Sequence, residues 1–295
     1  MQQDQLNQLL SRAEQLLNRV EELLPPAPPA PDWNAHAFRW RKQGGRGFLE
    51  AIPRPHRIRL EDLRNIDRQK ELVDRNTRQF VQGLPANNVL LSGSRGTGKS
   101  SLVKAMLDKY ANQGLRLVEV DKHDLADLPD LIRLLRDRPE RFILFCDDLS
   151  FEADDPSYKT LKAALDGSLS APPENVLIYA TSNRRHLLPE FFDDNRQTRH
   201  VDGEIHPGEA VEEKISLSER FGLWVSFYPF DQEAYLAVVF SWLERLGVAV
   251  DDPEQVRAEA LRFALGRGSR SGRVAWQFAR DWAGRSRLET VQAAT

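Results

Sequence analysis

The chain has 295 residues, enough for one large domain or two modest ones with a sizeable buried core. Its hydrophobic fraction of 41% and charged fraction of 29% are those of a soluble globular protein. The formal net charge of -3 excludes a global basic field for nucleic acid, and the single cysteine, Cys146, excludes an internal disulfide.

The N-terminus lacks the cationic start and the apolar core of a signal peptide. No apolar run approaches the roughly 18 residues that a membrane span needs. A lone cysteine also fits a reducing compartment. We therefore expect a cytoplasmic protein.

Residues 3–24 predict an amphipathic helix. Its apolar positions alternate steps of four and three, as in a coiled-coil seam, at Leu6, Leu10, Ala13, Leu17, Val20 and Leu24. The seam lasts only about three heptads, so docking on the chain's own body and self-association both stay open. The prolines of residues 25–31 predict a semi-rigid spacer of roughly 20 Å, or a ligand for a proline-reading domain. If the helix is an assembly or docking device, residues 1–31 are also where an unknown protein partner would bind.

Residues 32–58 mix aromatic and basic side chains without a clear period. The mixture includes Trp33, Phe38, Arg39, Trp40, Arg41, Lys42 and Arg46. Such residues can stack on nucleic acid, but we interpret the segment as an arm whose tryptophans pack on a neighbouring surface. Residues 25–58 are accordingly assigned to a proline-rich linker and arm.

A regular alternation of short apolar runs and helical patterns begins near residue 60. The apolar runs cover residues 88–91, 115–120, 142–145, 175–180 and 224–228. This alternation predicts an α/β fold, a largely parallel sheet with helices on both faces. After Asp231 only helical stretches follow, at about 231–246, 253–266 and 271–285. The predicted domains are the helix 1–24, the arm 25–58, an α/β domain 59–229 and a small helical lid 230–295.

A glycine-rich motif follows the first of these apolar runs and precedes a helical pattern. It reads Gly93, Ser94, Arg95, Gly96, Thr97, Gly98, Lys99 and Ser100, with Ser101 next, and satisfies G-x-x-x-x-G-K-[ST]. Backbone N–H groups of such a loop curl around a phosphate, and the helix N-terminus adds favourable partial charge. Lys99 can reach the β and γ phosphates of ATP, and Ser100 can ligate Mg²⁺.

Two adjacent carboxylates, Asp147 and Asp148, end the apolar run 142–145. A carboxylate at the carboxyl end of a central parallel strand lies beside the crevice where ligands bind. We expect Asp147 to hold Mg²⁺, usually through water, and Asp148 to polarise the attacking water.

Together these motifs resemble the AAA+ ATPase superfamily over about residues 60–285. The resemblance implies a P-loop sheet domain followed by a helical lid, with Asn183 as sensor 1 and Arg273 as sensor 2. It also implies that Arg220 is an arginine finger that reaches a neighbouring subunit's ATP. Ile66 and Asp67 lie where the family's adenine-facing segment lies. A ring or open spiral of like subunits follows if Arg220 acts in trans.

More narrowly, the chain is similar to an uncharacterised bacterial family of single-module AAA+ proteins, a domain of unknown function. The similarity is carried by residues 66–70, 145–151 and 219–224. One departure from the commonest AAA+ pattern is the second acidic residue, Asp148 in place of Glu. Its carboxylate is one methylene shorter, so we expect slow ATP hydrolysis.

Three functions stay open at this point. The first is an ATP-driven remodeller of another protein. The second is a nucleic-acid loader or initiator, and the third is a nucleotide-dependent switch that scarcely hydrolyses ATP. In a loader, the arginines of the last helices would contact phosphates, unless they form only a solvated face. These arginines are Arg262, Arg267, Arg270, Arg273, Arg280, Arg285 and Arg287.

Overall fold

The computed structural model describes residues 10–12, 14, 28–151, 156–166, 173–183, 199–201, 204–206 and 217–293. Residues 10–12 and 14 are helical, and the rest of the helix expected over residues 3–24 lies outside the described residues. The start of the proline spacer lies outside them too. None of the helices in the described ranges is both long and apolar enough to cross a membrane.

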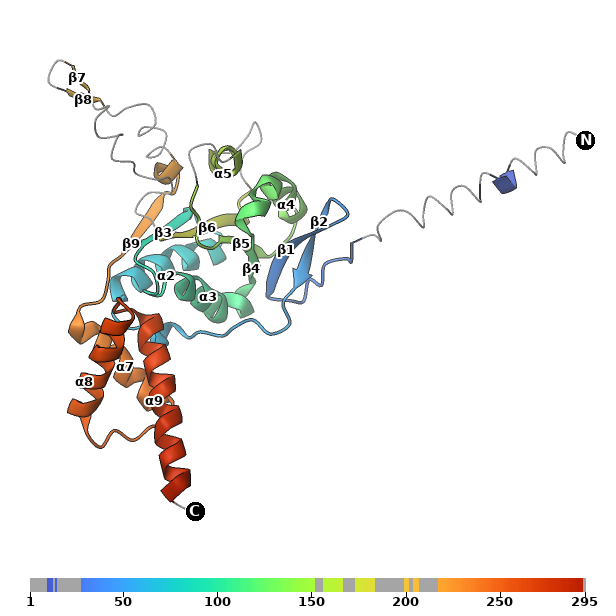
Figure 1. The fold of residues 1–295 in the computed structure, drawn as a ribbon. Coiled ribbons are helices and arrows are strands. Elements are labelled where there is room, and N and C mark those ends of the chain that lie inside the picture. Colours follow the sequence, from blue (N-terminus) through green and yellow to red (C-terminus); the bar gives the residue numbers. More distant parts are fainter. Residues whose placement is uncertain are drawn as a thin grey trace, which may run out of the picture.

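A seven-stranded sheet forms the centre of the α/β domain (Figure 1). Its strands run in the order β2-β1-β4-β5-β6-β3-β9. Only β2 is antiparallel to its neighbour. The strands span Ala37–Gln43 (β1), Arg46–Ala51 (β2), Val89–Gly93 (β3), Leu115–Glu119 (β4), Arg141–Cys146 (β5), Val176–Ser182 (β6) and Leu223–Phe227 (β9). A separate hairpin pairs Arg199–Val201 (β7) with Glu204–His206 (β8).

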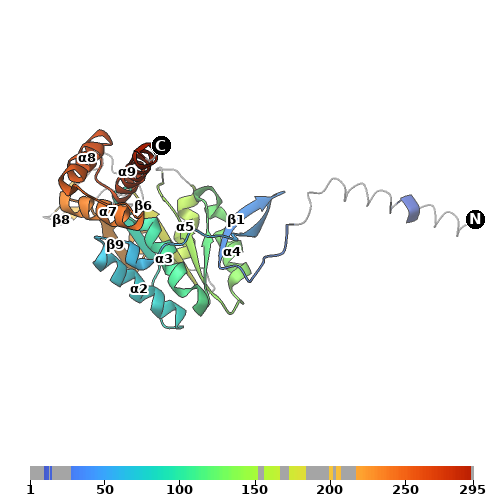
Figure 2. The ribbon, with the colours of Figure 1, turned by 90° about the horizontal axis from the view of Figure 1, so that it is seen from below.

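Helices cover both faces of this sheet (Figure 2). They are α2 (Asp67–Val81) and α3 (Lys99–Tyr110) on one face, and α4 (Leu128–Leu135) and α5 (Pro156–Asp166) on the other. Short 3₁₀ turns occupy Leu60–Asp62 (η1), Ala111–Gln113 (η2) and Lys122–Asp127 (η3). In β5, Phe142 and Leu144 join the core under α4 and α5, whereas Ile143 and Phe145 join the core under α2 and α3. A strand buried on both sides reads as one continuous apolar run, which is the pattern that predicted it.

Residues 37–51 correct the assignment of residues 25–58 to a linker and arm, because they form β1 and β2 of the sheet. β1 pairs with β4 in parallel, with Phe38 opposite Val118. Phe38 is 1% exposed and Trp40 is 4% exposed, so neither ring is available to stack on nucleic acid. Arg39 and Arg41 alternate with these rings on the opposite side of the strand, where Arg39 pairs with Glu119 at 2.6 Å. Trp33 packs on Phe38 with its ring centroid 6.1 Å away.

Three further helices build the lid around a core of its own. They are α7 (Gln232–Arg245), α8 (Pro253–Gly266) and α9 (Gly272–Ala293). Their buried side chains include Tyr235, Leu236, Val239, Ala260 and Phe278. The lid meets the α/β domain at the segment before α2. There Arg245 pairs with Asp62 at 2.8 Å, and the Asn65 side chain donates to the Ala234 carbonyl at 2.7 Å.

Trp40→Ala should destabilise the protein strongly if β1 and β2 belong to the core. The ring presses against the backbone of Gly47, and its Nε1 donates to Asp127 at 2.9 Å. Loss of a buried tryptophan typically lowers the free energy of unfolding by about 3–5 kcal/mol, which urea titration would measure. Removal of residues 1–31 is the control, and we expect it to change the unfolding free energy by less than about 0.5 kcal/mol. A loss below about 1 kcal/mol in Trp40→Ala would contradict the assignment.

Candidate functional site

Three neighbouring parallel strands deliver the polar residues of the candidate site to one edge of the sheet. The strands are β5, β6 and β3, adjacent in that order. β3 continues into the loop before α3, β5 is followed by Asp147 and Asp148, and β6 is followed by Asn183. Across the sheet the strands follow chain order from β4 to β5 to β6, and the next strand is then the earlier β3. Open α/β sheets bind ligands at the carboxyl ends of the strands where the strand order reverses in this way.

The loop between β3 and α3 has a backbone that only glycine accommodates easily. Gly93 has φ 125°, and a Cβ there would lie 2.0 Å from the Phe227 carbonyl oxygen. Gly98 has φ 103° and directly precedes the first turn of α3, which contains Lys99, Ser100 and Ser101. The Thr97 hydroxyl donates to the Ser94 carbonyl at 2.8 Å, and the Arg95 side chain is exposed. The result is a fixed loop that ends at a helix N-terminus.

Lys99 lies at the centre of this loop and is 5% exposed. Its Nζ donates to the carbonyls of Gly93 and Ser94, each at 2.7 Å, and to Asn183 Oδ1 at 2.9 Å. Burial lowers the pKa of Lys99 to about 8, while Asp148 and Asp147 counteract this and Arg273 and Arg95 add to it. A buried cation with a lowered pKa lacks the neutralising charge that an anionic ligand would supply.

The two carboxylates each bind a different part of the site. Ser100 Oγ donates to Asp147 Oδ1 at 2.6 Å. Asn183 Nδ2 donates to Asp148 Oδ1, and the same amide accepts from Lys99. One hydrogen-bonded chain therefore joins Lys99, Asn183 and Asp148, and a second pair joins the start of α3 to Asp147.

The start of the lid helix α9 lies against the loop. A Cβ built on Gly96 would lie 2.8 Å from Ser271 Oγ and 3.2 Å from Arg273 Cβ. Ser271 is buried and its Oγ accepts from the Val274 amide at 3.3 Å, within the first turn of α9. Arg273 is thus brought to the loop that Lys99 occupies, although its side chain is exposed.

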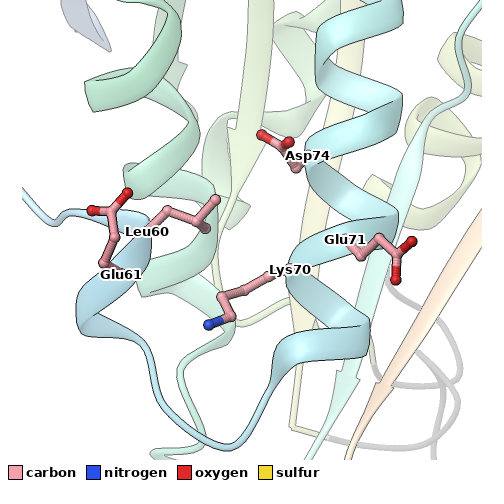
Figure 3. A pocket seen from close by; sticks show the side chains of 5 residues that line it. All are labelled: Leu60, Glu61, Lys70, Glu71 and Asp74. Carbon is pink, nitrogen blue, oxygen red and sulfur yellow. The ribbon is translucent and has the colours of Figure 1, made fainter.

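Ile66 and Asp67, adjacent in the chain, have different surroundings at this site. Ile66 is buried, with its Cδ1 3.6 Å from a Cβ built on Gly98, so it lies against the loop. The Asp67 side chain is 85% exposed and pairs with Lys70 at 2.6 Å. A hollow of about 220 Å³ between η1 and α2 is lined by Leu60, Glu61, Lys70, Glu71 and Asp74 (Figure 3). Its three carboxylates oppose a phosphate ligand, so it does not compete with the loop.

Arg220 is separate from this cluster in a single chain. Its Nε donates to Asp166 Oδ1, at the end of α5, at 2.6 Å. The side chain is 23% exposed. Its described partner therefore lies on α5 and is not part of the glycine-rich loop.

Sequence reasoning missed Thr181 of β6. Its hydroxyl donates to Asp147 Oδ1 at 2.6 Å and accepts from the Asp148 amide at 2.9 Å. Side chains two apart share one face of a strand, so the position of Thr181 two residues before Asn183 was an available signal.

The family profile described as "Protein of unknown function (DUF815)" matches residues 33–286. The chain belongs to this family. The match confirms the resemblance drawn from residues 66–70, 145–151 and 219–224. No protein with a curated description matches the chain.

Among solved structures, the chain is similar to the Thermotoga maritima RuvB Holliday junction branch migration motor. The identity is 16% and the TM-score 0.50, with 79% of this chain and 65% of that chain covered. The chain thus spans just under two thirds of that motor. It is also similar to the FIGL-1 AAA domain in complex with ADP, at 18% identity and a TM-score of 0.51, covering 77% of this chain and 73% of that one. These likenesses confirm the predicted fold, an AAA+ P-loop domain with a helical lid.

Proposed function

We propose that the chain binds ATP with Mg²⁺ between its α/β domain and its lid, and hydrolyses ATP slowly to remodel a protein partner. The observation that carries this proposal is the network joining Lys99, Asn183 and Asp148 beside the Ser100–Asp147 pair. The AAA domain of FIGL-1, which has a similar fold, binds ADP.

The residues of the loop fit a nucleotide. Left-handed glycines leave the backbone N–H groups open to phosphate oxygens, and the 12-residue helix α3 presents its N-terminus to them. Lys99 would exchange its bonds to Gly93 and Ser94 for the β and γ phosphates, which supply the charge that its burial lacks. Ile66, against Gly98, would line the adenine side.

The metal ligands also fit. Mg²⁺ prefers oxygen ligands, and the Ser100 hydroxyl and the Asp147 carboxylate are hydrogen-bonded at 2.6 Å. When bound, Mg²⁺ would neutralise charge on the phosphates. Asp148 would accept the proton of the attacking water, with Asn183 holding its carboxylate. Arg273, from the lid, would contact the γ phosphate of the same chain.

A protein partner is the favoured target of this ATPase. The rings near the N-terminus that suggested nucleic-acid stacking, Phe38 and Trp40, are buried. Two lid arginines are engaged within the lid, because Arg285 pairs with Glu259 at 3.3 Å and Arg280 stacks over Trp276. The net charge of -3 also disfavours DNA. ATPase rates measured alone, with DNA and with candidate proteins would separate the loader and the switch from the remodeller.

Asp148→Asn should keep ATP binding and lose turnover, because the amide keeps the shape of the carboxylate but cannot accept the water's proton. We expect the turnover number to fall by about 10²–10⁴-fold, measured as phosphate release at saturating ATP. Asp130→Asn is the matched control, since it changes an exposed carboxylate on α4. A wild-type rate in Asp148→Asn would remove Asp148 as the base. If the remodelling proposal holds, the ATP-loaded variant should also retain a partner that the ADP-loaded one releases.

A further inference from the structure

Thr181 contacts three consecutive residues at the end of the neighbouring strand. Its hydroxyl donates to Asp147 Oδ1 at 2.6 Å and accepts from the backbone amide of Asp148 at 2.9 Å. Its carbonyl accepts from the amide of Leu149 at 2.7 Å. The side chain is 1% exposed, so water does not compete for these bonds. Thr181 therefore binds the entire turn that carries both carboxylates.

The hydroxyl leaves one oxygen of Asp147 available. Ser100 and Thr181 both donate to Oδ1, and within the described ranges no group donates to Oδ2. Two donors on one oxygen fix the rotation of the carboxylate and point the other oxygen away from them. A hydroxyl has one hydrogen to donate, and Thr181 uses it here while its oxygen accepts a second bond.

The turn that Thr181 binds has an uncommon backbone. Asp148 has φ 53°, the left-handed region that non-glycine residues seldom adopt. Such conformations persist only where the surrounding structure holds them, and they cluster at functional sites. The bond from the Asp148 amide to Thr181 Oγ1 is one such restraint, and it orients the side chain that meets Asn183.

We propose that Thr181 is a positioning residue that sets both carboxylates, Asp147 toward Mg²⁺ and Asp148 toward the attacking water. The inference rests on the proposed ATPase function and adds to it a hydroxyl whose hydrogen bonds go to Asp147 Oδ1 and the Asp148 amide. The hydroxyl acts through its hydrogen bonds, so its shape alone does not replace it.

Thr181→Val tests this directly, because valine keeps the shape and removes both hydrogen bonds. Residues that orient metal ligands typically contribute about 10–100-fold to metal affinity or activity. We expect the turnover number to fall by that factor and the Mg²⁺ concentration for half-maximal rate to rise. The affinity for ATP without Mg²⁺ should stay within about twofold. Thr181→Ser keeps the hydroxyl and should restore both quantities to near the wild-type values.

Thr77→Val is the matched control for loss of a buried hydroxyl. Thr77 is fully buried on α2, and its Oγ1 bonds the Val73 carbonyl at 2.8 Å and the Tyr179 hydroxyl at 2.9 Å, neither of which belongs to the site. It should lower thermal stability without raising the Mg²⁺ requirement. If Thr181→Val loses activity only in proportion to its unfolded fraction, as Thr77→Val does, the positioning role is overturned.

Nucleotide binding separates this inference from the ATPase proposal. With a fluorescent ATP analogue, the ratio of affinities with and without Mg²⁺ is measured in wild type, Thr181→Val and Thr181→Ser. If the wild type binds Mg²⁺-ATP without hydrolysing it, the ATPase proposal fails. Even then, a ratio of the two affinities that falls in Thr181→Val and not in Thr181→Ser supports the role of Thr181 toward Asp147. An unchanged ratio together with an unchanged rate would overturn the inference. Absence of any nucleotide binding by the wild type would overturn both.

Discussion

Lys99→Ala should show no stabilisation by ATP, whereas the wild type should gain about 2.7 kcal/mol at ATP a hundredfold above its Kd. Lys99 is the cation at the centre of the loop, hydrogen-bonded to Gly93 and Ser94. Its burial lowers its pKa to about 8, so the folded protein holds this ammonium without enough compensating charge. The phosphates of ATP would supply that charge. Thermal unfolding with and without Mg²⁺-ATP measures the difference.

The matched control for this variant is Lys104→Ala. Lys104 lies on the same helix, α3, five residues further along, and lines a different hollow beside β2 and the end of the helix. Its removal should leave the ATP-dependent shift at the wild-type value. Equal shifts in the wild type and in Lys99→Ala would contradict the assignment of residues 93–100 as a phosphate loop.

Each strand predicted from an apolar run, and each lid helix predicted from a helical pattern, is present in the structure. The apolar run 142–145 gave β5 because its residues are buried alternately on both faces of the sheet. The lid helices followed from the helical stretches after Asp231, and the structure adds side-chain caps at their starts. Asp231 and Asp252, for example, each accept backbone amides at the start of α7 and α8.

Residues 37–51 were harder to interpret, because their pattern divides between a core face and a charged face. Phe38 and Trp40 alternate with Arg39 and Arg41, and the two arginines bind Glu119 and Glu50. A partner 80 residues away, as Glu119 is from Arg39, cannot be read from the local sequence. The glycine pair that joins the two strands was the one local sign of a hairpin.

The residues of the candidate site are also of two kinds, those that a local motif predicts and those that only the fold brings together. Lys99, Ser100 and Asp147 follow from motifs, because the phosphate loop and the strand end have fixed spacing in the chain. Thr181 and the Arg220–Asp166 pair depend on which side chains meet across strands and helices. Asp67 was placed at the adenine side by the family resemblance alone, and in the structure its exposed side chain pairs with Lys70.

Arg220→Ala should bind ATP as the wild type does and lose most of its turnover. An arginine finger acting in trans contributes about 10³–10⁵-fold to the rate of hydrolysis. In one chain Arg220 Nε pairs with Asp166 at 2.6 Å, so acting as a finger would require the side chain to release or share that carboxylate. Asp166→Ala separates a role of Arg220 in hydrolysis from a role in the ion pair. It removes the ion pair, which at a partly exposed site contributes about 0–1 kcal/mol, and should leave turnover intact. If Arg220 served only the pair, both variants would lose activity equally.

Mixing Arg220→Ala with Lys99→Ala tests whether the site is shared between subunits. Neither variant should hydrolyse ATP alone, because one lacks the finger and the other lacks the phosphate lysine. In a mixed assembly, an intact Arg220 from the Lys99→Ala subunit can face the intact loop of the Arg220→Ala subunit, so part of the activity should return. The recovered rate should rise with total protein concentration, as assembly requires. Full activity in Arg220→Ala alone, or a rate per subunit that does not depend on concentration, would contradict the shared site and favour a nucleotide switch that acts as a single chain.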